Sequence, residues 1–342
     1  MDPLREPVRH AQTMSASNPV ARAIGGYFEL EVGLTRTELY PDAIAVQSAR
    51  SAFLLLLGAV KPSRVWLPWY ICESMTEQAC QADIPVVRYG LDESFGISDA
   101  VEIRRGDCLL YVNYFGLCDE NVKKVLSRYP RKQVVIDNSQ ALFATPHECL
   151  ATIYSPRKFV GVPDGGYLLA SGVEPPEVDD DGSVGRCIPL LMRLGGLPEN
   201  GYAGHLESEE ALSGQVPKNM SALTHRLLRA IDYHSVATIR KANYETLHDS
   251  LSQRNSLHLQ RDDAVVPLSY PFVGGSPSLR HVLIANRVYV PRYWPQLIKT
   301  DSPVPEFERF LANECIPLPC DQRCAPEDLA RVVGLVKMNF GA

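Results

Sequence analysis

Short apolar runs alternate with amphipathic stretches over the first half of the chain. Apolar runs rich in β-branched residues are typical of buried strands in a parallel sheet. Such runs predict seven strands, at residues 43–46, 65–68, 85–89, 108–112, 133–136, 151–154 and 167–170. Helical patterns separate several of them, for example at residues 53–60. Strands that alternate with helices predict an α/β fold with a mostly parallel sheet covered by helices on both faces.

The second half of the chain has a different pattern. Residues 174–182 are acidic and rich in turn formers, which predicts a loop, and residues 198–218 form a second polar span. Apolar side chains then recur at near-helical intervals from Leu223 to Leu247 and predict one long helix that bridges two domains. After Leu257 the pattern predicts a small α+β domain, with strands at 265–270 and 288–291 and helices at 278–286, 305–313 and 328–338. We therefore expect an N-terminal arm over residues 1–24, a large domain over 25–245 and a small C-terminal domain over 246–342.

Composition narrows the class of protein. A chain of 342 residues is long enough for a large and a small domain, and its formal net charge of -6 is unfavourable for general binding to nucleic acid. Its nine cysteines show neither a CxxC pair nor zinc-type spacing, so we expect a reducing cytoplasm and no metal site. The longest apolar run, residues 53–60, is too short to span a bilayer, and residues 1–26 lack a hydrophobic signal core. We therefore expect no membrane association.

An acid and a lysine stand at the ends of two predicted strands. Asp137 directly follows the strand at 133–136, and Lys158 comes four residues after the strand at 151–154. Open α/β sheets place their ligand groups at such strand ends. Pyridoxal phosphate (PLP) needs a lysine to form an imine and a carboxylate to keep its ring nitrogen protonated. The pair therefore predicts a PLP site in which Lys158 also acts as a general base.

Each of these residues also has a structural explanation when taken singly. A surface lysine in a basic turn explains Lys158, and a turn former at a strand end explains Asp137. Asp137 and Lys158 occur together, about one strand apart, and Gln140 and a PDGG turn flank them. This joint appearance favours a PLP site.

Two further parts of a PLP site can be assigned. Ser48, Ala49, Arg50 and Ser51 lead into the first predicted helix, where free backbone N–H groups attract phosphate. An ordinary serine N-cap is the alternative there. Tyr70, after the strand at 65–68, can stack on the cofactor ring or pack at the rim. Asn113, after the strand at 108–112, is expected to face the same crevice.

A series of short motifs carries a family resemblance. In chain order these are SARSA, LPWYICES, VNYFG, DNSQA, YSPRKFVGVPDGG and KNMS. The series resembles PLP-dependent nucleotide-sugar aminotransferases of the DegT/StrS class, within the aspartate-aminotransferase fold. The resemblance runs from about Gly25 to the C-terminus and is strongest between Leu110 and Leu168. It implies a homodimer with shared active sites.

The resemblance also implies roles for single residues. Lys158 matches the Schiff-base lysine, Asp137 the pyridinium partner, and Gln140 the residue near the cofactor's phenolate oxygen. Other positions depart from the family pattern. Arg50 stands in a turn that is usually Ser-Gly-Thr, and Ser155 precedes the lysine by three residues instead of five, where it is expected to bind phosphate as in aspartate aminotransferases. Asn219 falls near an Asn-Tyr-Arg-Met segment that reaches the partner subunit's cofactor, but the arginine is absent.

The expected activity is transfer of an amino group from glutamate, the expected donor, to a nucleotide-linked keto-sugar. A PLP-dependent sugar dehydratase on the same fold is one alternative, although relatives with that chemistry tend to have histidine in place of the lysine. A non-catalytic protein of the PLP fold with regulatory or interaction duties is another. Arg280, Tyr293 and Trp294 are either substrate contacts or packing residues.

Overall fold

A computed structural model describes residues 30–33, 36–98, 101–179, 182–259, 262 and 264–340 of the chain. The arm expected over residues 1–24 lies outside these residues. Gly33–Ala342 forms one compact unit, and the description below refers to it.

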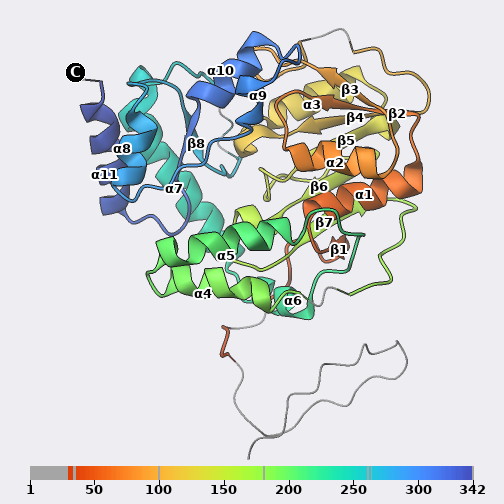
Figure 1. Cartoon of the computed structure of the whole chain (residues 1–342), viewed down its shortest axis with the longest axis horizontal. Coiled ribbons are helices and arrows are strands. Elements are labelled where there is room, and N and C mark those ends of the chain that lie inside the picture. The colour runs from red at the N-terminus through yellow and green to blue at the C-terminus, as the bar shows by residue number, and fades with distance from the viewer. Residues whose placement is uncertain are drawn as a thin grey trace, which may run out of the picture. The chain divides into compact units, whose positions relative to one another are not determined.

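Seven strands form the central sheet, in the order β1-β7-β6-β5-β4-β2-β3 (Figure 1). They are β1 (Ile44–Val46), β2 (Arg64–Pro68), β3 (Val86–Tyr89), β4 (Asp107–Val112), β5 (Val134–Asn138), β6 (Ala151–Tyr154) and β7 (Gly166–Ala170). Strands β2 to β6 pair in parallel, whereas β7 runs antiparallel to both β1 and β6. Each strand lies where the sequence predicts one, and the mostly parallel α/β fold is confirmed.

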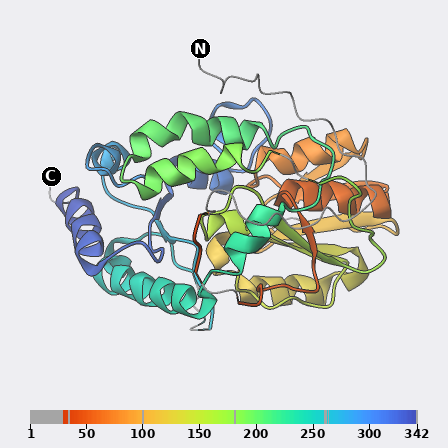
Figure 2. The same ribbon diagram turned by 90° about the horizontal axis from the view of Figure 1, so that it is seen from below.

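Helices cover both faces of this sheet. Figure 2 shows α1 (Ala49–Val60) and α2 (Glu73–Gln81) on one face and α3 (Asp119–Arg128) on the other. The first of them forms because Ser48 caps its N-terminus and accepts a hydrogen bond from the Ser51 N–H, and because its apolar side chains are buried against the sheet. It ends at Lys61, which adopts a left-handed conformation with φ 47°.

The rest of the chain is mainly helical and holds a second, two-stranded sheet. Its helices are α4 (Ile188–Leu194), α5 (Pro198–Glu210), α6 (Ala222–Leu228), α7 (Tyr233–Leu251), α8 (Leu279–Ala285), α9 (Gln296–Lys299), α10 (Glu306–Glu314) and α11 (Pro326–Met338). Strands β8 (Tyr270–Phe272) and β9 (Ile316–Leu318) pair antiparallel beside α7. Short 3-10 turns join several elements: η1 (Tyr114–Gly116), η2 (Arg131–Gln133), η3 (Pro156–Lys158), η4 (Gly185–Cys187) and η5 (Ser252–Arg254).

One helix in the second half was not predicted, and one prediction there was wrong. The polar span 198–218 carries no helix prediction, but α5 occupies most of it and packs against α4. Pro198 fits the first turn of α5 because the missing N–H of proline is not needed there. The single long helix expected from Leu223 to Leu247 is divided into α6 and α7, because Asp232 caps a new helix by accepting a hydrogen bond from the Ser235 N–H (3.1 Å).

The two strands expected in the C-terminal part were also wrong. Residues 265–269 form no strand because Pro267 has no N–H and the Leu268 N–H donates to the Phe115 carbonyl (2.8 Å). Residues 288–291 are not a strand either, since the Val288 N–H caps α8 by donating to the Leu283 carbonyl (2.9 Å). The helices expected at 278–286, 305–313 and 328–338 are confirmed as α8, α10 and α11.

One hydrophobic cluster connects the central sheet with the C-terminal elements, from Val46 to Val336. The boundary expected at residue 245 stays a prediction. Within the described residues, no helix is long and apolar enough to cross a membrane. All nine cysteines are free thiols.

Candidate active site

The predicted site residues follow neighbouring strands at one edge of the central sheet. Asp137 on β5 is paired with Ile153 on the parallel strand β6, so Lys158 leaves the sheet at the same edge. Asn113 follows β4 on the other side, and its N–H donates to the Asp137 carbonyl oxygen (3.0 Å). Because β7 runs in the opposite direction, Gly165 starts it from this edge. The strand order thus brings together residues that are far apart in the sequence.

The predicted phosphate turn joins the same edge. Ser48 forms an isolated bridge with Gly165, whose N–H donates to the Gln47 carbonyl (2.7 Å). The hydroxyls of Ser48 and Ser51 are buried and lie 2.9 Å apart, and the Ser51 N–H donates to Ser48 Oγ (3.2 Å). Ala49, half-buried, is the first residue of α1. The turn therefore presents its hydroxyls and α1's N-terminus beside the start of β7.

Asp137 and Lys158 each have a side-chain polar atom without a partner in the described part of the chain. Asp137 is buried, and its Oδ1 accepts a hydrogen bond from the Ser139 N–H (2.8 Å). Among the described residues, Asp137 Oδ2 has no hydrogen-bond partner. Lys158 lies at the end of η3 with an exposed side chain, and no hydrogen bond or ion pair holds its Nζ within the described part of the chain. Both groups are thus left available to a ligand.

Other predicted residues make contacts within the protein. Gln140 Oε1 accepts from the N–H of Phe115, which has a positive φ of 56°. The Asn113 amide donates to Asp119 (2.6 Å) and to Asn138 (3.2 Å), and its Oδ1 accepts from the Cys118 N–H (3.0 Å). These bonds use the whole Asn113 amide to shape the loop after β4, so its contact with a cofactor stays a prediction.

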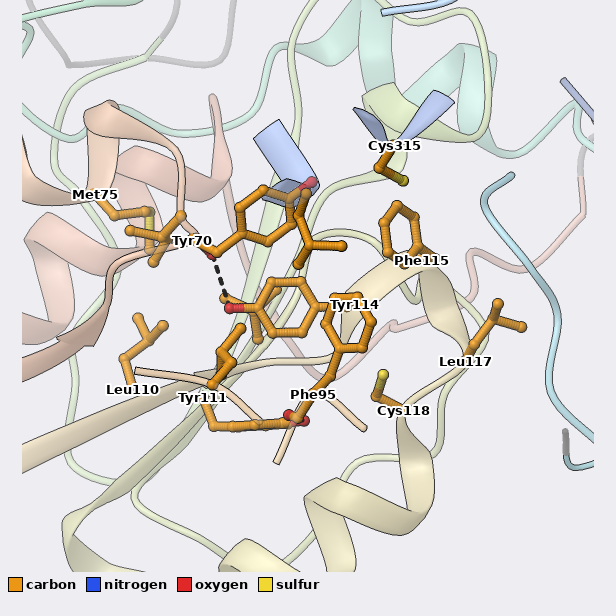
Figure 3. Packing of buried hydrophobic residues seen from close by; sticks show 14 of the residues in the cluster. Tyr70, Met75, Phe95, Leu110, Tyr111, Tyr114, Phe115, Leu117, Cys118 and Cys315 are labelled. Atoms are coloured by element: carbon orange, nitrogen blue, oxygen red, sulfur yellow. Dashed lines mark hydrogen bonds between the residues drawn. The ribbon is translucent and has the colours of Figure 1, made fainter. Parts of the chain in front are cut away.

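Tyr70 lies in an aromatic cluster under the same edge (Figure 3). Its ring is 1% exposed and meets Trp294 edge to face, with centroids 4.2 Å apart. The Tyr114 hydroxyl donates to the Tyr70 carbonyl oxygen (2.7 Å), as the dashed line in Figure 3 marks. Burial raises the pKa of the Tyr70 hydroxyl well above its ordinary value. This environment is that of a packed core side chain, and stacking on a cofactor stays a prediction.

Tyr293 and Trp294, two of the three C-terminal candidates for substrate contacts, belong to the same aromatic cluster as Tyr70. Tyr293 stacks on Trp294, with centroids 5.6 Å apart. The buried Arg280 donates to the carbonyl oxygens of Cys315 (2.8 Å) and Pro291. All three side chains therefore take part in packing.

Ser155 and Asn219 remain at the margin of the assembled site. Ser155 is buried and precedes η3. The Asn219 amide donates to the Pro176 carbonyl (2.9 Å) and to Asp179 (3.2 Å) of its own chain. Its expected reach into a partner subunit stays a prediction.

An ion-pair cluster beside Lys158 was not expected. Glu209 on α5 bonds Arg157 through Oε1 and Arg50 through Oε2, the latter at 3.4 Å. Burial raises the pKa of the Glu209 carboxyl, but the two arginines outweigh burial, so its pKa lies below the ordinary value. The proline at the start of α5 was a sequence signal for this helix, but no local pattern pairs residues so far apart.

Two more contacts fix the segment around Lys158. Asp164 of the PDGG turn is fully buried and accepts from the N–H (3.0 Å) and hydroxyl (2.6 Å) of Ser221. The Phe159 carbonyl oxygen accepts from the Arg240 guanidinium (3.2 Å) and the Gln322 amide (2.9 Å). The lysine is therefore positioned by residues from distant parts of the chain.

A surface hollow of about 750 Å³ lies elsewhere on the chain. It is lined by the C-terminal half of α1, the loops at 61–62 and 82–84, residues 172–174 and Pro217. None of the predicted site residues line it, so it is not part of the candidate active site.

No protein-family model matches the chain, and no curated protein matches it in sequence. Solved structures do match. The sugar aminotransferase CalS13 from Micromonospora echinospora is 15% identical with a TM-score of 0.62, and the match covers 88% of each chain. DesV of S. venezuelae, solved with a ketimine intermediate, is 15% identical with a TM-score of 0.61, over 88% of this chain and 85% of DesV. The chain has the fold of the DegT/StrS sugar aminotransferases.

The DegT/StrS fold also includes a dehydratase among the matched structures. The GDP-4-keto-6-deoxy-D-mannose-3-dehydratase of E. coli, solved with bound hydrated PLP, is 16% identical with a TM-score of 0.58, over 86% of this chain and 87% of the enzyme. The resemblance expected from the sequence motifs is thus confirmed in the fold. Since one fold supports more than one chemistry, the reaction has to be argued from the site.

Proposed function

We propose that the chain is a PLP-dependent aminotransferase that transfers an amino group, from glutamate as donor, to a nucleotide-linked keto-sugar. One observation carries the proposal. Asp137 lies at the end of β5 and Lys158 follows the adjacent parallel strand β6, at one sheet edge, in a chain with the fold of sugar aminotransferases. Lys158 is the lysine that binds the cofactor covalently.

The free groups at this edge suit PLP. Asp137 Oδ2, which has no partner among the described residues, is available to accept the N–H of a protonated pyridine ring. A carboxylate in this role holds the ring proton in place. The bound cofactor would supply an electron sink for the substrate's α-carbon.

Lys158 is suited to move a proton. Its Nζ is exposed and has no internal partner within the described part of the chain, so it can reach a substrate carbon at the open edge. The backbone below it is fixed, because Asp164 and the Phe159 carbonyl are both held by hydrogen bonds. A flexible side chain on a rigid turn allows the lysine to bind the cofactor and later act as a base.

The residues around Ser48 suit the cofactor's phosphate. Ser48 and Ser51 supply two hydroxyls, and Arg50 adds a guanidinium in the first turn of α1. Ser155 directly precedes η3, the turn that carries Arg157 and Lys158, and would complete this set. Asp137 at one end and this turn at the other would orient the ring between them.

We propose further that the active molecule is a homodimer. Large apolar side chains are exposed on the α4–α5 hairpin: Ile188, Leu191, Leu194, Leu197, Tyr202 and Leu206. Leu194 is 84% exposed, which is costly for a side chain of this type in water. A gathered apolar surface of this kind is typical of a protein interface. The hairpin also carries Glu209, which connects this surface to the candidate site.

The proposal is tested with purified protein and PLP. We expect an absorbance band of the bound cofactor, its loss on borohydride reduction, and a cofactor label on Lys158 by mass spectrometry. Lys158→Ala should remove the band, whereas Lys124→Ala on exposed α3 should keep it. A chain that takes up no PLP would refute the proposal.

Product analysis separates the alternatives. With glutamate and a nucleotide-linked keto-sugar, an aminated product supports the aminotransferase and a deoxygenated product supports the dehydratase. The retained Lys158 favours the former. If Lys158→Ala left the cellular function intact, a non-catalytic role would replace both.

A further inference from the structure

Glu209 holds two guanidinium groups that come from two different elements of the candidate site, α1 and η3. Its Oε1 bonds Arg157, the residue before Lys158, and its Oε2 bonds Arg50, in the first turn of α1. The Glu209 backbone carbonyl also accepts from Arg50 (3.5 Å). Both arginine side chains are mostly buried, with 17% and 15% of their surface exposed. A single carboxylate therefore bridges two cations beside the residue proposed to bind the cofactor.

The cluster has more donors than this carboxylate satisfies. Arg157 Nε is buried, and within the described residues no acceptor reaches it. A buried donor without an acceptor is costly, and native proteins seldom retain one without a reason. Arg50 and Arg157 carry two positive charges against the one negative charge of Glu209, and Lys158 adds a third nearby. A tetrahedral dianion offers more acceptors and more charge than a carboxylate.

We propose that Arg50 and Arg157 form a binding site for a phosphoryl group, and that Glu209 competes with this group for the two guanidinium groups. An arriving phosphoryl group takes over both guanidinium groups and supplies an acceptor for Arg157 Nε. Glu209 is displaced as an ion, with no covalent change. The inference rests on the proposed function only for the source of the phosphoryl group, either the cofactor's phosphate ester or the diphosphate of a nucleotide-linked substrate.

Glu209 lies near the C-terminal end of α5, in the hairpin that α5 forms with α4. In Figure 1, α4 and α5 lie side by side as two green helices, joined through Gly195 and Gly196, the latter with a φ of 82°. The other end of α5 is held by Glu199, which accepts from Arg287 (2.8 Å). Loss of the Glu209 contacts would therefore loosen the C-terminal end of α5 while Glu199 retains its start.

Titration with inorganic phosphate tests the site without any cofactor. Glu209→Gln removes the competing charge, so we expect it to bind phosphate about tenfold more tightly than the unaltered chain. Glu207→Gln removes the same charge from an exposed position of the same helix and should leave the affinity unchanged. Adding Arg157→Gln to Glu209→Gln should abolish the gain. Equal affinity in Glu209→Gln and Glu207→Gln, or a gain that survives Arg157→Gln, would overturn the inference.

Hydrogen exchange on the unaltered chain provides a second readout if Glu209→Gln does not fold. Saturating phosphate should speed exchange of α5 amides and leave those of α11 unchanged. Unchanged exchange in α5 would contradict displacement of Glu209.

The source of the phosphoryl group follows from two further titrations. If loading with PLP blocks phosphate binding, and pyridoxal without its phosphate does not, the cofactor is the source. If UDP displaces phosphate from a chain already loaded with PLP, the substrate's diphosphate is the source. Phosphate binding that responds to Glu209→Gln in a chain that takes up no PLP would refute the proposed function and leave the anion site standing.

Discussion

Gly166 lies so close to Ser48 that a β-carbon built on it would stand 2.3 Å from the Ser48 carbonyl carbon. No side chain fits this distance without moving the backbone of one of the two residues. The contact is what brings the start of β7 against the first turn of α1, and the proposed phosphate turn depends on it.

Gly166→Ala should separate β7 from α1. Overpacking at a buried site costs about 1–3 kcal/mol, so we expect a lower midpoint of thermal unfolding and weaker retention of PLP. Gly58→Ala in α1 has open space around the new methyl group and should be neutral or slightly stabilising. Equal behaviour of the two variants would contradict the role assigned to Gly166.

Asp137→Asn should lower the rate of amino transfer by about a hundredfold or more, because the neutral amide no longer stabilises a charged cofactor ring. The unfolding midpoint should change little, since the amide oxygen can still accept from the Ser139 N–H. Single-turnover kinetics with glutamate measures the rate. Asp249→Asn, on the exposed face of α7, serves as the control. An Asp137→Asn variant with full activity would exclude this acid from the reaction.

Leu194→Glu should weaken the proposed homodimer. A charge placed at an apolar interface must be desolvated on association, so we expect the dimer dissociation constant to rise at least about tenfold. Sedimentation equilibrium measures this constant. Phe310→Glu changes an exposed apolar residue on α10, outside the hairpin, and should leave it unchanged. A Leu194→Glu variant that dimerises normally would place the interface elsewhere.

Glu38 should contribute stability that depends on pH. It contacts His225 (2.8 Å), Arg229 (3.0 Å) and the Tyr167 hydroxyl (3.0 Å). Burial raises the pKa of the Glu38 carboxyl, but the contacts with His225, Tyr167 and Arg229 together outweigh burial, so its folded pKa lies below the ordinary 4.5. The stabilisation is then complete above pH 4.5 and is lost as the pH falls through the lowered pKa.

This pH dependence can be tested by measuring the free energy of unfolding of the Glu38→Gln variant at several pH values. At pH 7 we expect a loss of about 2 kcal/mol, the usual worth of a hydrogen bond to a charged group. The difference from the unaltered chain should shrink below pH 4.5. The exposed Glu207→Gln variant should show no such dependence, and a constant difference for Glu38→Gln down to pH 2 would disprove the assignment.

The central sheet was predictable from sequence because its strands are buried on both faces and consist of short apolar runs. The acid and the lysine were predictable because Asp137 comes at the end of one such run and Lys158 four residues after another. Helix α5 was missed since its composition is polar and its apolar residues are exposed rather than on a buried face. The pairing of β8 with β9 joins residues more than forty positions apart, and local periodicity carries no information about it.

The ion pair between Arg50 and Glu209 is a contact within the site that could not be predicted from local sequence patterns either. These residues are 159 positions apart, and neither has a neighbour that signals the other. Arg50 was noticed because it departs from a family pattern, whereas Glu209 is one of three glutamates in a row of four residues. Only the fold selects which of them faces the arginines.

The hydrogen bonds from Arg240 and Gln322 to the Phe159 carbonyl have a consequence for synthesis of the chain. A ribosome makes the sheet strands, Asp137 and Lys158 well before it reaches Gln322, so the turn that carries the lysine lacks one of its anchors during most of translation. In nascent chains arrested before residue 322, we therefore expect the central sheet to be formed and the turn at Lys158 to be less rigid than in the complete chain. The last of the contacts that hold the turn at Lys158 is therefore added only near the end of translation, after nearly all of the surrounding protein has been made.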